Sequence, residues 1–216
     1  MDTSFPPPQG LSLPRLAPEE ALARGSERAV FDWPDQPGLL IKVMHPHALR
    51  RDARGGVRDP VGQRERRAWQ AALAYATRTR RPPPVAEVIA CLPWGSGTAH
   101  IVRKVADADG RMGPTLALLA DQGRLGDAEI EMLNDLVADL QAAGIVVHDA
   151  RPANFVLETS RHGASRFVLV DGFGDRALVP LRSWLPVLAR RRLATALYRT
   201  ARETGLHWDG RRLSRP

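Results

Sequence analysis

The chain has 216 residues, of which 44% are hydrophobic and 25% charged, and its formal net charge is +7. This composition supplies enough apolar material for a core, excludes an intrinsically disordered protein, and predicts one domain or a compact two-lobed unit. Neither a long apolar run nor a secretion signal is found, so neither membrane spanning nor export is expected. The single Cys91 excludes an intramolecular disulfide and favours the cytoplasm; its plainest interpretation is a small buried side chain in a strand.

The positive charge is carried almost entirely by arginine, because Lys42 and Lys104 are the only lysines among 31 basic residues. Arginine and lysine differ in geometry, so the two lysines attract attention. A surplus of positive charge favours anionic partners in general, including nucleotides, nucleic acid and lipid headgroups, and does not choose among them.

The first half of the chain predicts a tail, four strands and one helix. The proline-rich residues 1–16 predict a flexible tail, and residues 45–60 a loop. The strands are expected at 28–33, 38–44, 85–92 and 98–105, with 34–37 and 93–97 as connections. The helix is expected from Val61 to about Thr79, because apolar residues recur there at helical spacing, and it must end before Pro82.

The second half is predicted to be mainly helical. A helix begins after Asp127, a good N-cap, and ends at Gly144. A hairpin with its turn at 160–165 follows, and a last helix runs from Arg182 to about Glu203, with Gly205 as its stop. The expected architecture is α+β and two-lobed, with a nucleotide between the lobes. The predicted boundaries are a tail at 1–16, an N-lobe at 17–106 and a C-lobe at 107–216.

The most informative motif combines Asp149, Asn154 and Asp171-Gly172. An acid, an amide five residues later, and a second acid after an apolar strand are the groups that phosphoryl transfer requires. Asp149 would position the acceptor hydroxyl and accept its proton, while Asn154 and Asp171 would bind Mg²⁺ through oxygen atoms. The alternative is a hairpin whose acids only cap turns.

Two neighbours of Asp149 have expected roles. Arg151 would hold negative charge on the transferring phosphoryl group, or, as a structural alternative, pair with a nearby acid. His148 is expected to support the loop rather than to transfer protons.

A nucleotide site requires further groups nearer the N-terminus. Lys42 on a strand would hold the first two phosphates, and Glu65 on the following helix would orient it. The alternative is a snorkelling lysine at a strand edge and an ordinary surface glutamate. Gly25 and Ser26 are the candidate phosphate-covering turn, although a plain strand connection is an equal alternative.

At these residues the chain resembles the protein-kinase-like superfamily and, more closely, the bacterial YrbL family of PhoP regulatory network proteins. The resemblance runs from about Gly25 to Leu197, and segment 178–184 is the part that resembles this family in particular. It implies a small kinase-like fold, ATP binding with Mg²⁺, and an undefined acceptor. The departures are His148 directly before Asp149, one extra residue in the turn after Asp171, and a poor glycine-rich loop.

Three functions follow as hypotheses. The first is a phosphotransferase that uses ATP and Mg²⁺ and acts on a small or envelope-related hydroxyl acceptor, because the short stretch after Asp171 leaves no platform for a peptide. The second is a kinase-like regulatory protein that binds nucleotide without turnover. The third is nucleic-acid binding, suggested only by the net charge and Arg190-Arg191-Arg192; without an aromatic stacking platform, a solvated helix face is the better interpretation.

Overall fold

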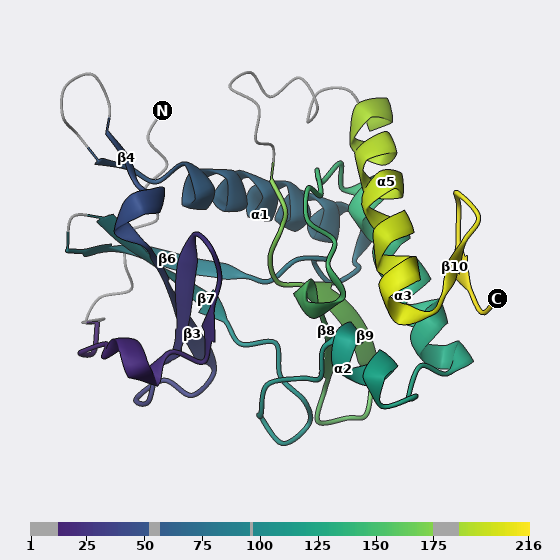
Figure 1. Ribbon diagram of the computed structural model, residues 1–216, viewed down its shortest axis with the longest axis horizontal. Coiled ribbons are helices and arrows are strands. Elements are labelled where there is room, and N and C mark those ends of the chain that lie inside the picture. The colour runs from purple at the N-terminus through teal and green to yellow at the C-terminus, as the bar shows by residue number, and fades with distance from the viewer. Residues whose placement is uncertain (1–12, 52–56, 96, 175–185) are drawn as a thin grey trace. The chain divides into compact units, whose positions relative to one another are not determined.

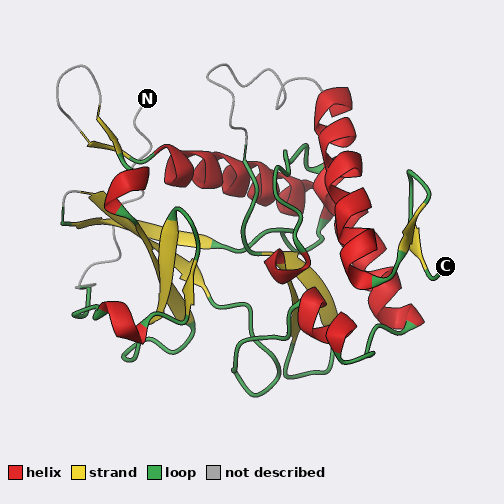
Figure 2. Ribbon diagram, viewed as in Figure 1, coloured by secondary structure: helices red, strands yellow, loops and turns green. Residues whose placement is uncertain are grey.

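The computed structural model describes residues 13–51, 57–95, 97–174 and 186–216 (Figure 1). Their contacts group the chain into two compact units, of which the first comprises Met1–Gln63 with Glu87–Lys104 and the second Arg64–Ala86 with Val105–Pro216. A five-stranded antiparallel sheet and four α-helices make up most of the regular structure in the described part (Figure 2). The predicted α+β class is therefore confirmed, while the lobe boundaries at 16/17 and 106/107 stay a prediction.

The first unit is built on the antiparallel sheet, whose strand order is β1-β2-β3-β7-β6. Its strands are β1 (Ala23–Arg24), β2 (Arg28–Asp32), β3 (Leu39–Met44), β6 (Val88–Trp94) and β7 (Gly97–Arg103). Strand β6 continues through Pro93, which the sequence assigned to a connection. Proline is tolerated there because β6 is an edge strand and the missing N–H is not needed by a neighbour.

The segment predicted to be a loop between β3 and the first helix carries local structure. It contains a short 3₁₀ helix, η2 (Pro46–Ala48), and a two-stranded ribbon of β4 (Arg50–Arg51) and β5 (Val57–Arg58). Another short 3₁₀ helix, η1 (Pro18–Glu20), precedes the sheet. These elements are too short to leave a periodic apolar pattern in the sequence.

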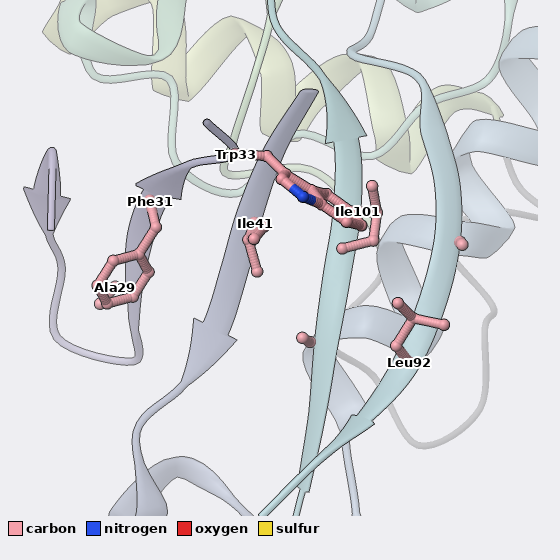
Figure 3. Close-up of a cluster of buried hydrophobic side chains, with 8 residues drawn as sticks. Ala29, Phe31, Trp33, Ile41, Leu92 and Ile101 are labelled. Carbon is pink, nitrogen blue, oxygen red and sulfur yellow. The ribbon is translucent and has the colours of Figure 1, made fainter. Parts of the chain in front are cut away.

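One face of the sheet forms an apolar core. Phe31, Ile41 and Ile101 lie opposite one another across neighbouring strands, and Figure 3 shows them with Leu92 and Trp33. Residues that alternate along a strand share a face, so this side of the sheet is built by every second residue. Leucines 13 and 16, which fall within the predicted flexible tail, pack against this cluster. The last part of that segment is therefore attached to the sheet.

The opposite face carries polar groups. Val30, Lys42, His100 and Cys91 form one row across β2, β3, β7 and β6. His100 and Lys42 are buried, with only 2% and 6% of their surface exposed. A buried charge requires a partner. For His100 the partner is the carboxylate of Asp59, the residue directly before the helix that begins at Pro60.

Helix α1 (Pro60–Thr79) confirms the predicted helix and continues from the first unit into the second. Within the second unit it is joined to helix α3 (Asp127–Ala142), because Tyr75 Oη donates to Asp139 Oδ1 at 2.6 Å. Arg81 Nε lies 3.1 Å from the same oxygen. Burial and this hydrogen bond to a carboxylate raise the pKa of the Tyr75 phenol.

The rest of the second unit is a hairpin covered by helices. The elements are α2 (Leu116–Asp121), η3 (Pro152–Asn154), β8 (Phe155–Thr159), β9 (Ser165–Leu169), α5 (Pro186–Thr204), β10 (His207–Trp208) and β11 (Leu213–Ser214). Strands β8 and β9 pair as the sequence predicted, α3 contacts β9, and α5 contacts both α2 and α3.

Three details of the predicted helices change. Asp127 is the first helical residue rather than the N-cap; Gly126 holds that position, and its N–H donates to Glu129 Oε2 at 2.9 Å. Helix α2 was not predicted, because six residues give too little periodicity. The last helix is described from Pro186, so its predicted start at Arg182 lies outside the described residues, as does segment 178–184. The predicted ends at Gly144 and Gly205 are confirmed.

None of the described helices has both the length and the apolarity needed to cross a membrane.

Candidate functional site

In the second unit, the segment that leads to Asp149 runs antiparallel to the turn that follows Asp171. Three backbone hydrogen bonds join them: Gly174 N to Val146 O at 2.8 Å, His148 N to Gly172 O at 2.8 Å, and Asp149 N to Gly172 O at 3.1 Å. Backbone pairing of this kind fixes both segments independently of side-chain rotamers. The two predicted acidic segments are therefore held side by side.

Gly172 makes this approach possible. Its φ of +79° lies in the left-handed region. A Cβ at this position would collide with the carbonyl oxygen of Asp149. Any side chain at Gly172 would therefore push the two segments apart.

Asn154 is tied to the same cluster from the other side. Its Nδ2 donates to Asp149 O at 3.0 Å, and its own carbonyl oxygen accepts the N–H of Val170 at 2.9 Å. Because Asn154 precedes β8 and Asp171 follows β9 by two residues, both lie at the same end of the hairpin. The structure thus brings Asp149, Asn154 and Asp171 together, and their chemical roles stay predictions.

The donor set at this end of the hairpin suits a hard cation. With Nδ2 directed to Asp149 O, the amide oxygen of Asn154 is the atom left for a metal, and Asp171 supplies a carboxylate. Mg²⁺ binds through one or two protein oxygens and completes its shell with water and phosphate oxygens. Among the described residues no group of three or more His, Cys, Asp or Glu gathers as a metal site.

Arg151 pairs with Asp149 itself. Its Nε lies 3.0 and 2.9 Å from the two carboxylate oxygens, and its Nη2 lies 2.6 Å from Oδ2. The hydrogen bond to Asp149, then its charge, raise the pKa of Arg151. The structural alternative for Arg151, an ion pair with a nearby acid, agrees with this contact. The pair is open to solvent, because the side chain of Arg151 is 63% exposed and that of Asp149 25%.

His148 and Thr200 support the loop around Asp149. His148 Nδ1 lies 3.2 Å from the carbonyl oxygen of Gly174, in agreement with the supporting role predicted for it. The hydroxyl of Thr200, a fully buried residue of α5, donates to the carbonyl oxygen of Ala150. Helix α5 is therefore fixed directly onto the loop.

A cavity of about 180 Å³ lies between this loop and α5. Its loop wall includes His148 and Asp149, and its helix wall includes Arg192 and Arg199. The sequence singled out Arg192 only as part of the run Arg190-Arg191-Arg192 and did not indicate Arg199, because nothing in their spacing separates these two from the other arginines of the helix. Only the docking of α5 through Thr200 brings them to the loop.

Helix α1 reaches the turn after Asp171 from another direction. A Cβ on Gly174 would press against the backbone and Cβ of Arg64, so the helix and the turn are in close contact at this residue. The next residue, Glu65, is only 2% exposed. The alternative of an ordinary surface glutamate is wrong, and the functional role of Glu65 stays a prediction.

In the first unit, Lys42 lies on β3, the central strand of the sheet, and is buried. The alternative of a snorkelling lysine at a strand edge is therefore wrong. The other lysine, Lys104, forms an ion pair with Asp32. Lys42 thus differs from Lys104 in position and exposure, and its role as a phosphate ligand stays a prediction.

Gly25 and Ser26 form the turn between β1 and β2. The N–H of Gly25 donates to Arg28 O at 2.8 Å, which closes the hairpin. The side-chain Nε2 atoms of His45 and His47 lie 3.1 Å from Gly25 O and 2.7 Å from Ser26 O. These contacts favour the plain strand connection, because the glycine N–H is already used within the turn.

A buried network on the sheet was missed by the sequence analysis. Asp59 accepts hydrogen bonds from Gly62 N at 2.8 Å and from Thr98 Oγ1 at 2.7 Å, and it pairs with His100 Nε2. On the other side of the ring, His100 Nδ1 lies 3.4 Å from the half-buried Cys91 Sγ. Asp59-Pro60, an N-cap followed by proline at the first helical position, is the signal that could have found the helix start, but not the histidine.

The network shifts the pKa values of both of its charged groups, His100 and Asp59. Burial alone would lower the pKa of His100, but the hydrogen bond to Asp59, with the contact to Cys91, raises it to about 9. For Asp59, burial would raise the pKa, whereas His100, Gly62 and Thr98 together hold it well below its usual range. The network requires glycine at position 62, because a Cβ there would overlap the His100 ring.

A second, larger cavity of about 450 Å³ lies in the first unit. It is lined by Phe31, Val43, Leu49 and Trp94, among others. Phe31 and Val43 belong to the apolar face of the sheet, which alternation places opposite Lys42. The cavity is therefore on the other face from the predicted phosphate ligand.

Comparison with known proteins places the chain in a family. The model of the family described as PhoP regulatory network protein YrbL matches residues 15–205. A curated protein of Escherichia coli (strain K12), named uncharacterized protein YrbL, is 24% identical over 173 residues, which cover 79% of this chain and 78% of the relative. The protein of the same name from Shigella flexneri matches with the same identity and coverage. Because the family model spans most of the sequence, the chain belongs to the YrbL family of PhoP regulatory network proteins.

Proposed function

We propose that this protein is a kinase-like phosphotransferase that binds ATP with Mg²⁺ and transfers a phosphoryl group to a small or envelope-related hydroxyl acceptor. The observation that carries the proposal is the grouping of Asp149, Asn154 and the Asp171-Gly172 turn in one cluster. Phosphoryl transfer depends on positioning and on charge stabilisation more than on covalent chemistry by the protein. A cluster locked by backbone hydrogen bonds supplies such positioning.

Each residue of the cluster has a role in this proposal. Asp149 accepts a hydrogen bond from the acceptor hydroxyl and takes its proton as transfer proceeds. Asn154 and Asp171 hold the cation, which neutralises the terminal phosphates of the nucleotide when it is bound. Arg151 leaves the Asp149 carboxylate and turns toward the transferring group, a move favoured by its exposed side chain.

Lys42 and Glu65 are proposed as the nucleotide-holding lysine and its orienting acid. Both are charged residues in buried positions, where a charge is costly and requires a stabilising partner. Their contribution is tested separately, by nucleotide affinity: Lys42→Met is expected to weaken ATP binding, while Lys104→Met, at the ion pair with Asp32, is not.

The acceptor is proposed to be small. The cavity beside Asp149 measures about 180 Å³, below the range of about 300–1,000 Å³ usual for drug-sized ligands. Such a volume admits a single headgroup or sugar ring more readily than a peptide.

The proposal is tested by magnesium-dependent ATP turnover of the wild type and Asp149→Asn. Loss of the carboxylate is expected to reduce turnover by about 10²–10⁴-fold, since a positioned base contributes that much. Asp121→Asn, at an exposed acid at the end of α2, is the matched control and should keep wild-type turnover. Equal turnover in the wild type and Asp149→Asn would remove Asp149 from the mechanism.

One observation favours a second function, a regulatory protein that binds nucleotide without turnover. Arg151 forms a bidentate pair with Asp149 and neutralises the carboxylate that would serve as base. The family description, which refers to a PhoP regulatory network, agrees with such a role. In this case ATP with Mg²⁺ would raise the melting temperature, by RT ln(1 + [L]/Kd), with no turnover in either Asp149→Asn or the wild type. No nucleotide effect at all would contradict both functions.

A further inference from the structure

In the cavity beside Asp149, the wall formed by α5 has no role in either of the proposed functions. On α5, Arg192, Thr195, Ala196 and Arg199 line it. Their spacing of three, four and seven residues puts them on one face of the helix. The buried hydrogen bond from Thr200 to Ala150 fixes this face against the loop, so the wall is a built feature and does not depend on flexible side-chain contacts.

The charge of the cavity is positive. Asp149 is the one acid among its lining residues, against the two arginines of α5. Within the described part of the chain, neither Arg192 nor Arg199 has a recorded hydrogen bond or ion pair, whereas Arg166 and Arg212 each pair with a glutamate. Two guanidinium groups on one wall, against a single lining carboxylate, favour an anionic ligand.

The spacing of the two arginines limits which class of anion can bind. Seven residues along a helix correspond to about 10.5 Å, so their flexible side chains can reach one group from both sides. A guanidinium binds carboxylate and phosphate through paired N–H groups, and a dianionic phosphate monoester matches two such cations better than a single carboxylate does. The volume of about 180 Å³ accommodates a phosphate with a small attached group.

We propose that this cavity binds a phosphate monoester group of the acceptor, with Arg192 and Arg199 as its ligands. The inference rests on the proposed phosphotransferase function and specifies its substrate class: the acceptor carries a phosphate as well as the hydroxyl that faces Asp149. The two arginines determine specificity, because an acceptor without the phosphate leaves both of them unpaired.

The experiment measures binding of inorganic phosphate and of glucose 6-phosphate to the full chain, without nucleotide and at constant ionic strength, which keeps general screening equal. The double variant Arg192→Gln/Arg199→Gln is expected to bind both probes at least about tenfold more weakly than the wild type, as loss of a charge-assisted contact predicts. The matched control is Arg191→Gln/Arg202→Gln, which removes the same charge from exposed positions of the same helix outside the cavity. Equal weakening in both double variants, or no binding to the wild type, would overturn the inference.

A second measurement requires no variant and therefore does not depend on folding. Phenylglyoxal modifies accessible arginines, and glucose 6-phosphate is expected to protect Arg192 and Arg199, but not Arg191, in mass spectra of the wild type. Protection of all three to the same extent, or of none, would count against the site.

One further arm separates a soluble from a lipid-borne acceptor. Vesicles that contain phosphatidic acid present the same monoester on a lipid and are tested, beside glucose 6-phosphate, as competitors of bound inorganic phosphate. Displacement by vesicles at a lower concentration of the monoester than glucose 6-phosphate requires would identify a lipid-borne acceptor, and the reverse a soluble one, with either result supporting the site. The binding arms use no ATP, so loss of ATP turnover alone would refute the proposed function and leave the anion site standing. Phosphate binding that is absent while turnover persists would refute only the inference.

Discussion

Two polar clusters of this molecule differ in exposure, and this difference distinguishes the cluster that stabilises the fold from the candidate functional site. In the first unit, the paired side chains of His100 and Asp59 are 3% and 9% exposed. In the second unit, Arg151 and Asp149 also form a close pair, but they are 63% and 25% exposed. Similar contacts therefore have different consequences, because a buried pair cannot be exchanged for water, whereas an exposed pair can open for a ligand.

The buried cluster serves the fold. It holds the N-terminus of α1 against the sheet, with Asp59 as the acceptor for Gly62 N and Thr98 as well as for the imidazole. Every polar partner is satisfied by protein, which leaves little for a ligand to bind. The cluster around Asp149 instead borders a cavity, and this makes it the better candidate for function.

The largest expected change in stability comes from Asp59→Asn. Asparagine keeps the N-cap hydrogen bond but removes the charge, and breaking one side of a buried ion pair should lower the free energy of unfolding by about 3 kcal/mol or more. Asp149→Asn, at the exposed pair, should change it by less than about 1 kcal/mol. Urea unfolding of the two variants measures both values, and similar losses would contradict the contrast between the clusters.

The pH dependence of stability tests the same pair. The pKa of His100 is about 9 in the folded protein against an unperturbed 6.5. Because the folded pKa is the higher one, the stabilisation is fully present below pH 6.5 and is lost as the pH rises through 9. The expected loss is about 3 kcal/mol, measured by urea unfolding between pH 6 and 10. In Asp59→Asn this slope should flatten; an equal slope in that variant would assign the effect to another group.

Gly172→Ala is expected to have a smaller effect on stability, with an added effect on the site. The methyl group meets both a positive φ and the carbonyl oxygen of Asp149. Gly163→Ala is the matched control, since Gly163 has nearly the same φ, +80°, and nothing within 4 Å of the added Cβ. Thermal unfolding should show a loss about 1–2 kcal/mol larger for Gly172→Ala, from overpacking in addition to strain. Equal losses would mean that the close approach to Asp149 is unimportant.

The smallest effect is expected from Thr200→Val. The change removes the hydrogen bond from α5 to Ala150 O at nearly constant volume and should cost about 1 kcal/mol. Thr204→Val, whose hydroxyl bonds only to carbonyls within its own helix, is the control. If the bond also positions the helix wall of the cavity, Thr200→Val should weaken phosphate binding while Thr204→Val should not.

The sequence predicted the secondary-structure elements well where the apolar pattern extended over many residues or where glycine marked the end of an element. Helix α1, the β8–β9 hairpin and the ends at Gly144 and Gly205 follow from apolar spacing and from glycine, which are local properties. The short helix α2 and the β4–β5 ribbon have too few residues to carry such a signal. The continuation of β6 through Pro93 depends on its edge position, which is known only once the strand order is known.

For the site, the sequence alone determined that Asn154 and Asp171 should meet, because a hairpin with a short turn brings its two ends together whatever surrounds it. The tertiary structure decided what each of them touches. It placed Arg151 on Asp149, buried Lys42 and Glu65, joined Asp59 to His100 across 41 positions of the chain, and brought Arg192 and Arg199 to the loop. Contacts between residues far apart in the chain arise from packing, and no local pattern of residues encodes them.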